Sequence, residues 1–185
     1  DIKGGICYFL WNTQHNGPCN VKTINDSTVS EMSRYLSSSD NETFIRYNEA
    51  IPILEKVLSF KEESFATIVS KQKPFGLPTN YVASQNPNDG EIKVHAFKKK
   101  MYINRDMIIK NVEWIDSYKL FTPKAVGSGV MGEDKLQPII GTPGDICTET
   151  YLIVGISHNL DEVLNILSYT KTKFFHFMWG LKKIT

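Results

Sequence analysis

Proline and glycine divide the middle of this 185-residue chain into short segments. Pro74, Gly76 and Pro78 exclude a regular helix or a central strand across residues 72–80. A second break, Asn86-Pro87-Asn88-Asp89-Gly90, is a strong turn signal. Only short elements fit between such breaks, so we expect the middle of the chain to consist of strands. The predicted strands cover residues 81–84, 91–97, 100–103, 118–122 and 148–155.

Helical spacing of apolar residues appears on both sides of these strands. It predicts helices over residues 48–58, 64–71 and 161–167, with Asn48 and Asn159 as N-caps of the first and third. A last helix near the C-terminus carries an apolar stripe formed by Phe174, Phe177, Met178 and Leu181.

The N-terminal region is predicted to form a β-hairpin followed by a linker. A continuous apolar and aromatic run predicts a buried strand over residues 4–11, and residues 19–24 alternate like a half-exposed strand. Turn-forming residues separate the two, so we expect a β-hairpin within residues 1–24. A polar linker is expected at 25–43, and an α+β domain at 44–185.

Composition limits where such a chain can work. The longest strongly apolar run has six residues, Ile6 to Trp11, against the ~20 that a membrane-spanning helix needs. No basic segment leads into an apolar stretch, so we expect neither a signal peptide nor a membrane partner. Three cysteines without CxxC spacing favour neither a disulfide framework nor a zinc site. These features predict a cytoplasmic protein.

Basic residues gather in the middle of the chain. Residues 91–124 hold eight basic and four acidic side chains, although the net charge of the whole chain is only +1. Such an excess suits contact with a polyanion, and a solvated lysine face is the alternative. Three adjacent lysines, Lys98, Lys99 and Lys100, cannot all point inward on a strand, so at least one must reach solvent.

Few motifs favour catalysis. Residues 127–132 fit the spacing GxGxxG, but Glu133, Asp134 and Pro138 follow where a phosphate-binding helix should begin, which favours a simple glycine loop. Glu91-Ile92-Lys93 matches half of a restriction-type nuclease site, without an evident second acid. The histidines are scattered and predict no metal site: His15, His95, His158 and His176.

A collinear series of segments carries a resemblance. It begins with Ile-Lys-Gly-Gly-Ile-Cys-Tyr-Phe-Leu-Trp-Asn at residues 2–12 and continues through residues 44–50, 73–77, 114–119, 123–125, 148–152 and 172–175. The first segment resembles the last conserved strand of the catalytic domain in N6-adenine-specific DNA methyltransferases of restriction–modification systems. The later segments resemble the target-recognition domain of that family.

The resemblance implies the C-terminal part of such an enzyme. It implies a mixed or antiparallel sheet with C-terminal helices, preceded by a β-hairpin left over from an α/β methyltransferase domain. In that family S-adenosylmethionine binds a glycine-rich loop, and an Asn-Pro-Pro-Tyr motif holds the adenine. Neither occurs here, since the nearest string is Asn86-Pro87-Asn88-Asp89. We therefore expect no bound cofactor and no methyl transfer from this chain alone. Double-stranded DNA and the missing N-terminal catalytic domain are the expected partners.

The resemblance also suggests site residues. Phe9 best matches the aromatic residue that stacks on the flipped adenine in that family, with ordinary core packing as the alternative. A recognition domain holds phosphates with cations and reads base edges with polar loop residues. The expected phosphate contacts are Lys73, Lys98, Lys99, Lys100, Arg105 and Lys124. The expected base readers are Gln72, Asn80 and Ser128, for which ordinary loop polarity is the alternative.

Two other functions compete with this one. The first is a specificity subunit of a multi-subunit restriction system, where a comparable domain ends in helices that bind partner subunits. The apolar last helix fits that interpretation, but the predicted strand at residues 4–11 does not. The second is a restriction nuclease that uses Glu91 and Lys93, which magnesium-dependent cleavage would reveal.

Overall fold

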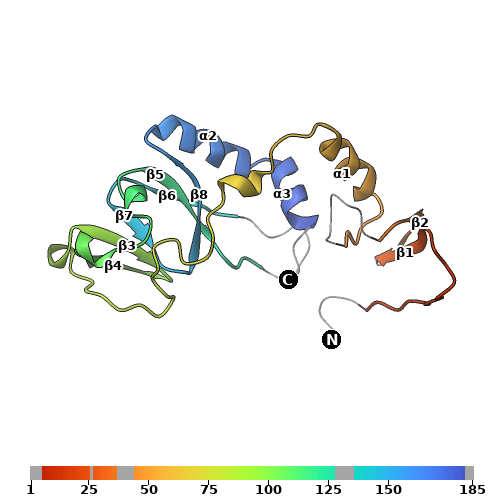
Figure 1. Ribbon diagram of the computed structural model, residues 1–185, viewed down its shortest axis with the longest axis horizontal. Coiled ribbons are helices and arrows are strands. Elements are labelled where there is room, and N and C mark those ends of the chain that lie inside the picture. Colours follow the sequence, from red (N-terminus) through yellow and green to blue (C-terminus); the bar gives the residue numbers. More distant parts are fainter. Residues whose placement is uncertain (1–5, 26, 37–43, 128–135, 182–185) are drawn as a thin grey trace. The chain divides into compact units, whose positions relative to one another are not determined.

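The computed structural model describes residues 6–25, 27–36, 44–127 and 136–181 (Figure 1). Helices and strands occur together, which confirms the predicted α+β class. The chain divides into two compact units: Asp1–Glu62, Ser128–Glu133 and Phe174–Thr185 form the first, and Glu63–Gly127 with Asp134–Lys173 form the second. Within the described ranges, no helix has the length and apolar character needed to cross a membrane.

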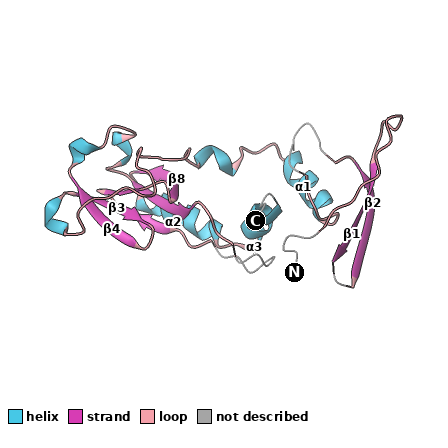
Figure 2. Cartoon of the chain, turned by 90° about the horizontal axis from the view of Figure 1, so that it is seen from below, coloured by secondary structure: helices cyan, strands magenta, loops and turns pink. Residues whose placement is uncertain are grey.

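The hairpin of the first unit is formed by β1 (Cys19–Asn25) and β2 (Thr28–Arg34), which pair in antiparallel fashion (Figure 2). The strand predicted at residues 4–11 is wrong over its described part, because residues 6–11 form no strand. The predicted linker at 25–43 is also wrong in part, because it contains β2. Asn25, Asp26 and Ser27 are turn-forming residue types, and so short a connection costs the least entropy to close. The strand at 19–25 therefore pairs with the segment that follows it.

Buried polar side chains join this hairpin to the start of α1 (Ala50–Ser59). Arg34 Nε donates a hydrogen bond to Asn48 Oδ1 at 2.9 Å. Asn48 Nδ2 in turn donates to the carbonyl oxygen of Val21 at 2.9 Å. The predicted N-cap role of Asn48 is therefore wrong, since Glu49 stands at the cap position without a side-chain cap bond.

The last helix, α3 (Lys173–Leu181), completes the apolar core of the first unit. Three of the four residues of its predicted stripe pack in that core, whereas Phe174 is 44% exposed. The members of this cluster are Ile45, Tyr47, Ala50, Ile51, Leu54, Phe177, Met178 and Leu181. Most of the stripe therefore packs within its own unit, and Phe174 remains exposed.

The second unit contains two three-stranded sheets, ordered β4-β3-β7 and β6-β5-β8 (Figure 1). In the first sheet β3 (Ile92–Ala96) pairs antiparallel with β4 (Lys99–Ile103) and parallel with β7 (Asp145–Cys147). In the second, β5 (Tyr118–Pro123) pairs antiparallel with β6 (Ile139–Gly141) and β8 (Tyr151–Ser157). The first sheet is therefore mixed and the second is antiparallel.

Most of the predicted strands of this unit are confirmed, within a few residues at their ends. The exception is the strand at 81–84, where only Ser84 forms an isolated bridge, with Tyr102. Sequence patterns missed β6 and β7, because three residues are too few to display a period. The helix predicted at 64–71 is the shorter 3-10 turn η1 (Phe65–Ile68). Further 3-10 turns are η2 (Pro87–Asp89), η3 (Arg105–Met107) and η4 (Val112–Trp114).

One helix, α2 (Leu160–Thr170), lies on the second sheet, where Val163 packs against Leu120 and Val154. Gly155 of β8 permits the helix to lie this close through Ile166: its φ is +60°, and a Cβ built there would lie 2.3 Å from Ile166 Cδ1. Asn159 caps the helix as predicted, accepting a hydrogen bond from the Asp161 amide at 2.9 Å. The larger core between the sheets includes Phe75, Val94, Met101, Phe121, Ile146 and Ile153.

Candidate nucleic-acid interface

The three adjacent lysines lie at the connection between β3 and β4. Ala96 pairs with Lys99, so Phe97 and Lys98 form the turn. The φ angle of Lys98 is 56°, in the left-handed region that favours glycine. The chain therefore keeps a positively charged side chain at a backbone position where glycine would be less strained.

All three lysines, Lys98, Lys99 and Lys100, are exposed, and none has a carboxylate within ion-pair distance among the described residues. Lys98 Nζ lies 5.2 Å from the centroid of the Phe97 ring, which is itself 61% exposed. A cation over an exposed ring gains little, so this contact leaves the charge of Lys98 available. The turn therefore presents three uncompensated charges to solvent.

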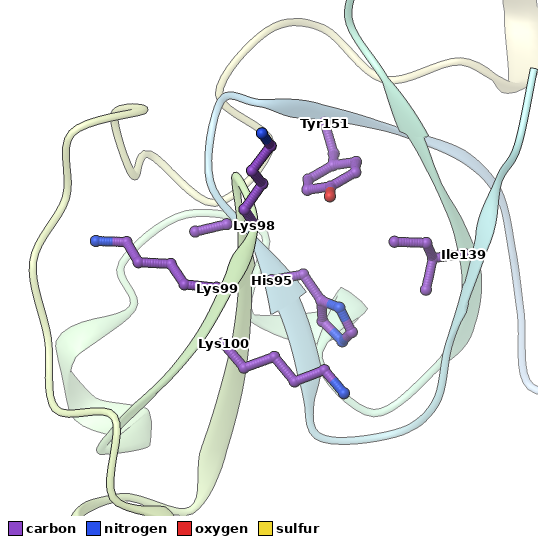
Figure 3. Close-up of a pocket in the computed structure, with 7 residues that line it drawn as sticks. His95, Lys98, Lys99, Lys100, Ile139 and Tyr151 are labelled. Carbon is purple, nitrogen blue, oxygen red and sulfur yellow. The ribbon is translucent and has the colours of Figure 1, made fainter.

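A shallow cavity of about 440 Å³, largely open to solvent, lies beside this turn (Figure 3). Figure 3 shows the Lys98 side chain beside Tyr151 and the Lys100 side chain beside the His95 ring, whereas Lys99 points away from both. His95 and Lys100 are partners in the β3–β4 register, which explains why their side chains share one face of the sheet. Ile139 forms the wall that faces the His95 ring.

A buried carboxylate lies next to His95, one of the residues that line the cavity. Asp145 Oδ1 lies 2.6 Å from Lys93 Nζ and 3.6 Å from His95 Nε2, and Oδ2 accepts hydrogen bonds from the amide and hydroxyl of Thr142, both at 2.9 Å. Burial alone would raise the pKa of Asp145, but the contacts with His95, Lys93 and Thr142 outweigh it and hold the pKa well below its usual range. Asp145 is therefore ionised at neutral pH and holds β7 against β3.

A buried lysine binds the backbone of the same residue, Asp145. Lys119 is 0% exposed, and its Nζ donates hydrogen bonds to the carbonyl oxygens of Trp114 at 2.7 Å, Ile115 at 3.1 Å and Asp145 at 2.8 Å. Burial lowers the pKa of Lys119 to about 8. Every proton of the ammonium group has an acceptor, so Lys119 is a structural residue that cannot reach a ligand.

The structure also locates the acid that the nuclease hypothesis lacked. Asp145 stands opposite Lys93 in the parallel register of β3 and β7. Its carboxylate is already paired with that lysine, and Glu91 Oε1 accepts a hydrogen bond from the Arg105 amide at 3.1 Å. Among the described residues, no group of three His, Cys, Asp or Glu side chains could hold a metal ion. This arrangement favours a structural role for the Glu91-Ile92-Lys93 segment.

A second group of predicted contacts is electrically compensated. Glu149 lies 3.5 Å from Lys73 Nζ and 3.2 Å from Lys124 Nζ, and Lys124 Nζ also donates to Gln72 Oε1 at 3.1 Å. The hydrogen bond from Lys124 and the charges of both lysines lower the pKa of Glu149. We call these four residues the Glu149 cluster. It lies close to the β3–β4 turn, because the Thr148 amide donates to the His95 carbonyl oxygen at 3.0 Å.

Arg105 is also paired. Its guanidinium binds both carboxylate oxygens of Asp116, at 2.8 and 2.5 Å. This two-point contact raises the pKa of Arg105 and lowers that of Asp116. A guanidinium held in this way has fewer N–H groups left for a phosphate than a free one.

The other predicted site residues do not join the turn. Asn80 is exposed in the loop before Tyr81, away from regular structure. Phe9 belongs to the first unit and is 81% exposed, so the core-packing alternative for it is not supported. Ser128 and residues 128–132 of the glycine loop lie outside the described residues.

Four residues near the turn escaped the sequence analysis as site residues: His95, Ile139, Asp145 and Tyr151. The sequence contains one signal for His95. It stands two residues after Lys93 in a predicted strand, and residues two apart share a face, so both polar side chains are expected on one face of β3. The remaining three lie more than 40 residues further along the chain, and no local pattern connects them to the lysines.

Comparisons with known proteins give no match. No protein-family model, no curated protein and no solved structure matches this chain. We therefore infer the function from the geometry of the second unit and from the sequence resemblance.

Proposed function

We propose that this chain is the DNA sequence-recognition part of an adenine-specific N6 DNA methyltransferase of a restriction–modification system. The observation that carries the proposal is the β3–β4 turn, with three adjacent lysines that are exposed and free of carboxylate partners among the described residues. Lysines in such a position are suited to hold successive phosphates. Lys73 and Lys124 of the Glu149 cluster add a smaller net positive charge nearby.

The division of labour follows from the resemblance. The catalytic domain would supply the S-adenosylmethionine site and the Asn-Pro-Pro-Tyr motif, and this chain would set the position of the enzyme on double-stranded DNA. Phosphate contacts fix register but carry no sequence information. Base readout would fall to polar residues around the turn, with Gln72, Asn80 and Ser128 as the sequence-based hypotheses. No activity is proposed for this chain alone.

The specificity-subunit alternative needs an apolar C-terminal helix that is free to bind a partner. Three residues of the α3 stripe, Phe177, Met178 and Leu181, instead pack in the core of their own unit, whereas Phe174 is exposed. This observation favours the methyltransferase interpretation. Sequencing the gene upstream of Asp1 would decide between them, because only a methyltransferase requires a glycine-rich donor loop and an Asn-Pro-Pro-Tyr motif there.

The direct test is the salt dependence of duplex binding. Fluorescence anisotropy with a labelled duplex would compare the unchanged protein with a K98G/K99A/K100A variant from ~50 to ~200 mM salt. Removing three phosphate contacts should lower the slope of log K against log salt by about 2–3 and weaken all sequences alike. Lys171→Ala, which removes an exposed lysine at the end of α2, is the control and should leave the slope unchanged. An unchanged slope in the triple variant, with the fold intact, would refute the proposal.

A further inference from the structure

The cavity beside the β3–β4 turn joins two kinds of surface. Lys98 and Lys100 are cationic, whereas Tyr151 and Ile139 offer an aromatic face and an aliphatic wall (Figure 3). A free inorganic anion would use the lysines but has no need of the ring. An apolar ligand would use the ring but not the charges. A nucleotide has a use for both surfaces, because it combines a phosphate with a base that stacks on aromatic side chains.

The directions in which the lysine side chains point further restrict the kind of ligand that fits. Lys98 lies beside Tyr151 and Lys100 beside His95, so the two inward lysines stand on different sides of the cavity (Figure 3). A nucleotide within a strand has one phosphate before its base and one after it. This arrangement therefore suits a nucleotide that is part of a chain, and Lys99, which points away, is left for a more distant phosphate.

His95 adds the edge of an aromatic ring to the cavity. The residue is 7% exposed, and its buried Nε2 faces the Asp145 carboxylate, with Oδ1 at 3.6 Å. In Figure 3 the ring lies between Lys100 and Ile139. Because Nε2 is buried against Asp145, we expect a ligand to pack against the exposed part of this ring and not to hydrogen-bond to Nε2.

We propose that this cavity takes one unstacked nucleotide of a DNA strand, with its base against Tyr151 and Ile139 and its neighbouring phosphates on Lys98 and Lys100. The cavity has a volume of about 440 Å³ and is largely open to solvent, so a nucleotide that remains part of a strand can reach it. Burial raises the pKa of Tyr151, so its hydroxyl stays neutral and can donate a hydrogen bond. This inference rests on the proposed function, and it adds that the domain binds a base outside the helical stack.

The test compares two duplexes that differ in one nucleotide. One is fully paired, and the other carries a single unpaired thymidine; both are titrated with the unchanged protein at ~50 mM salt. Because stacking on an aromatic ring is worth about fivefold or more per base, the unpaired duplex should bind at least about fivefold tighter. Tyr151→Phe keeps the ring and should retain this preference, whereas Tyr151→Leu should abolish it while both variants still bind the paired duplex.

A second measurement needs no variant. An unpaired 5-iodouracil placed in the same duplex should cross-link on irradiation to a peptide that contains Tyr151, as mass spectrometry would show. Equal affinity for the two duplexes, or a cross-link outside the cavity, would overturn this inference and leave the proposed function standing. Failure to bind either duplex would overturn both.

Discussion

Two groups of basic residues in the second unit look alike in the sequence and differ in the structure. At the β3–β4 turn, three lysines have no carboxylate partner among the described residues. In the Glu149 cluster, one glutamate pairs with both Lys73 and Lys124. A count of positive charges treats the five lysines as equal. The structure shows that three of them offer a full charge to a polyanion and that the other two share one negative charge.

This difference matters because a lysine that is already paired with a carboxylate contributes less free energy to the binding of a polyanion than an unpaired lysine does. A phosphate that binds Lys73 or Lys124 must compete with Glu149, whereas a phosphate that binds at the turn displaces only water and counterions. We therefore expect the turn to dominate DNA affinity and the Glu149 cluster to tune it. This contrast can be tested by substitutions in the two groups and at Asp145, which pairs with Lys93 on β3.

The largest expected effect is on the free energy of unfolding, when Asp145 is replaced. Asp145→Asn leaves Lys93 without its counter-charge in a site where the carboxylate side chain is only 5% exposed, and the free energy of unfolding should fall by about 2–3 kcal/mol. Urea denaturation at pH 7 measures this loss. Glu91→Gln makes the same chemical change at an exposed position just before β3, and it should cost less than about 0.5 kcal/mol.

The lowered pKa of Asp145 also makes the stability of the protein depend on pH. The pKa of Asp145 is lower in the folded protein than its unfolded value of about 3.9, so the unfolded state binds the proton more tightly. The contribution of Asp145 is then fully present above about pH 5 and is lost as the pH falls below about 4. The difference in stability between the unchanged protein and Asp145→Asn should shrink over that window. A constant difference would show that the ionised carboxylate contributes nothing.

A change of intermediate size tests the Glu149 cluster. Glu149→Gln frees Lys73 and Lys124, so duplex affinity at ~100 mM salt should rise about two- to fivefold with a steeper salt slope. Glu55→Gln, an exposed change on α1 with the same effect on net charge, is the control and should alter affinity much less. Removing both lysines of the cluster should weaken binding by less than about threefold. If that double variant lost as much affinity as the turn variant, the contrast between the two groups would be wrong.

The smallest expected effect separates neighbouring lysines of the turn. Lys98→Gly removes a side chain from a residue whose φ is 56°, so the relief of strain offsets the flexibility that glycine adds. Lys99→Gly introduces glycine into a strand without such relief and should be less stable than Lys98→Gly by about 1 kcal/mol. Thermal unfolding of the two variants measures the difference, and equal melting temperatures would contradict the strained conformation.

The secondary structure of the second unit was largely predictable because its signals are local. Proline, glycine and asparagine mark the turns, and Asn159 caps α2 through the hydrogen bond that its side chain predicts. The N-terminal hairpin was not predictable in the same way. Residues 19–24 alternate correctly as a strand, but alternation does not specify a partner, and the chain selects β2 over the more apolar segment before it.

The site was predictable only where it is contiguous. Lys98, Lys99 and Lys100 adjoin one another, so their shared location follows from the sequence. The compensation of Lys73 and Lys124 by Glu149 depends on contacts across 76 and 25 residues, as the separation of their numbers shows. Tyr151 and Ile139 reach the cavity through the pairing of β8 and β6 with β5. Tertiary contacts of this kind leave no trace in a local pattern.

The most direct test of the central claim is to ask which lysines DNA protects. The unchanged protein would be acetylated briefly, with and without a saturating duplex, and the modified lysines quantified by mass spectrometry. Our account predicts strong protection of Lys98, Lys99 and Lys100 and weak protection of Lys73 and Lys124, with Lys171 unchanged as an internal control. Equal modification of the turn lysines in the presence and absence of DNA would contradict it.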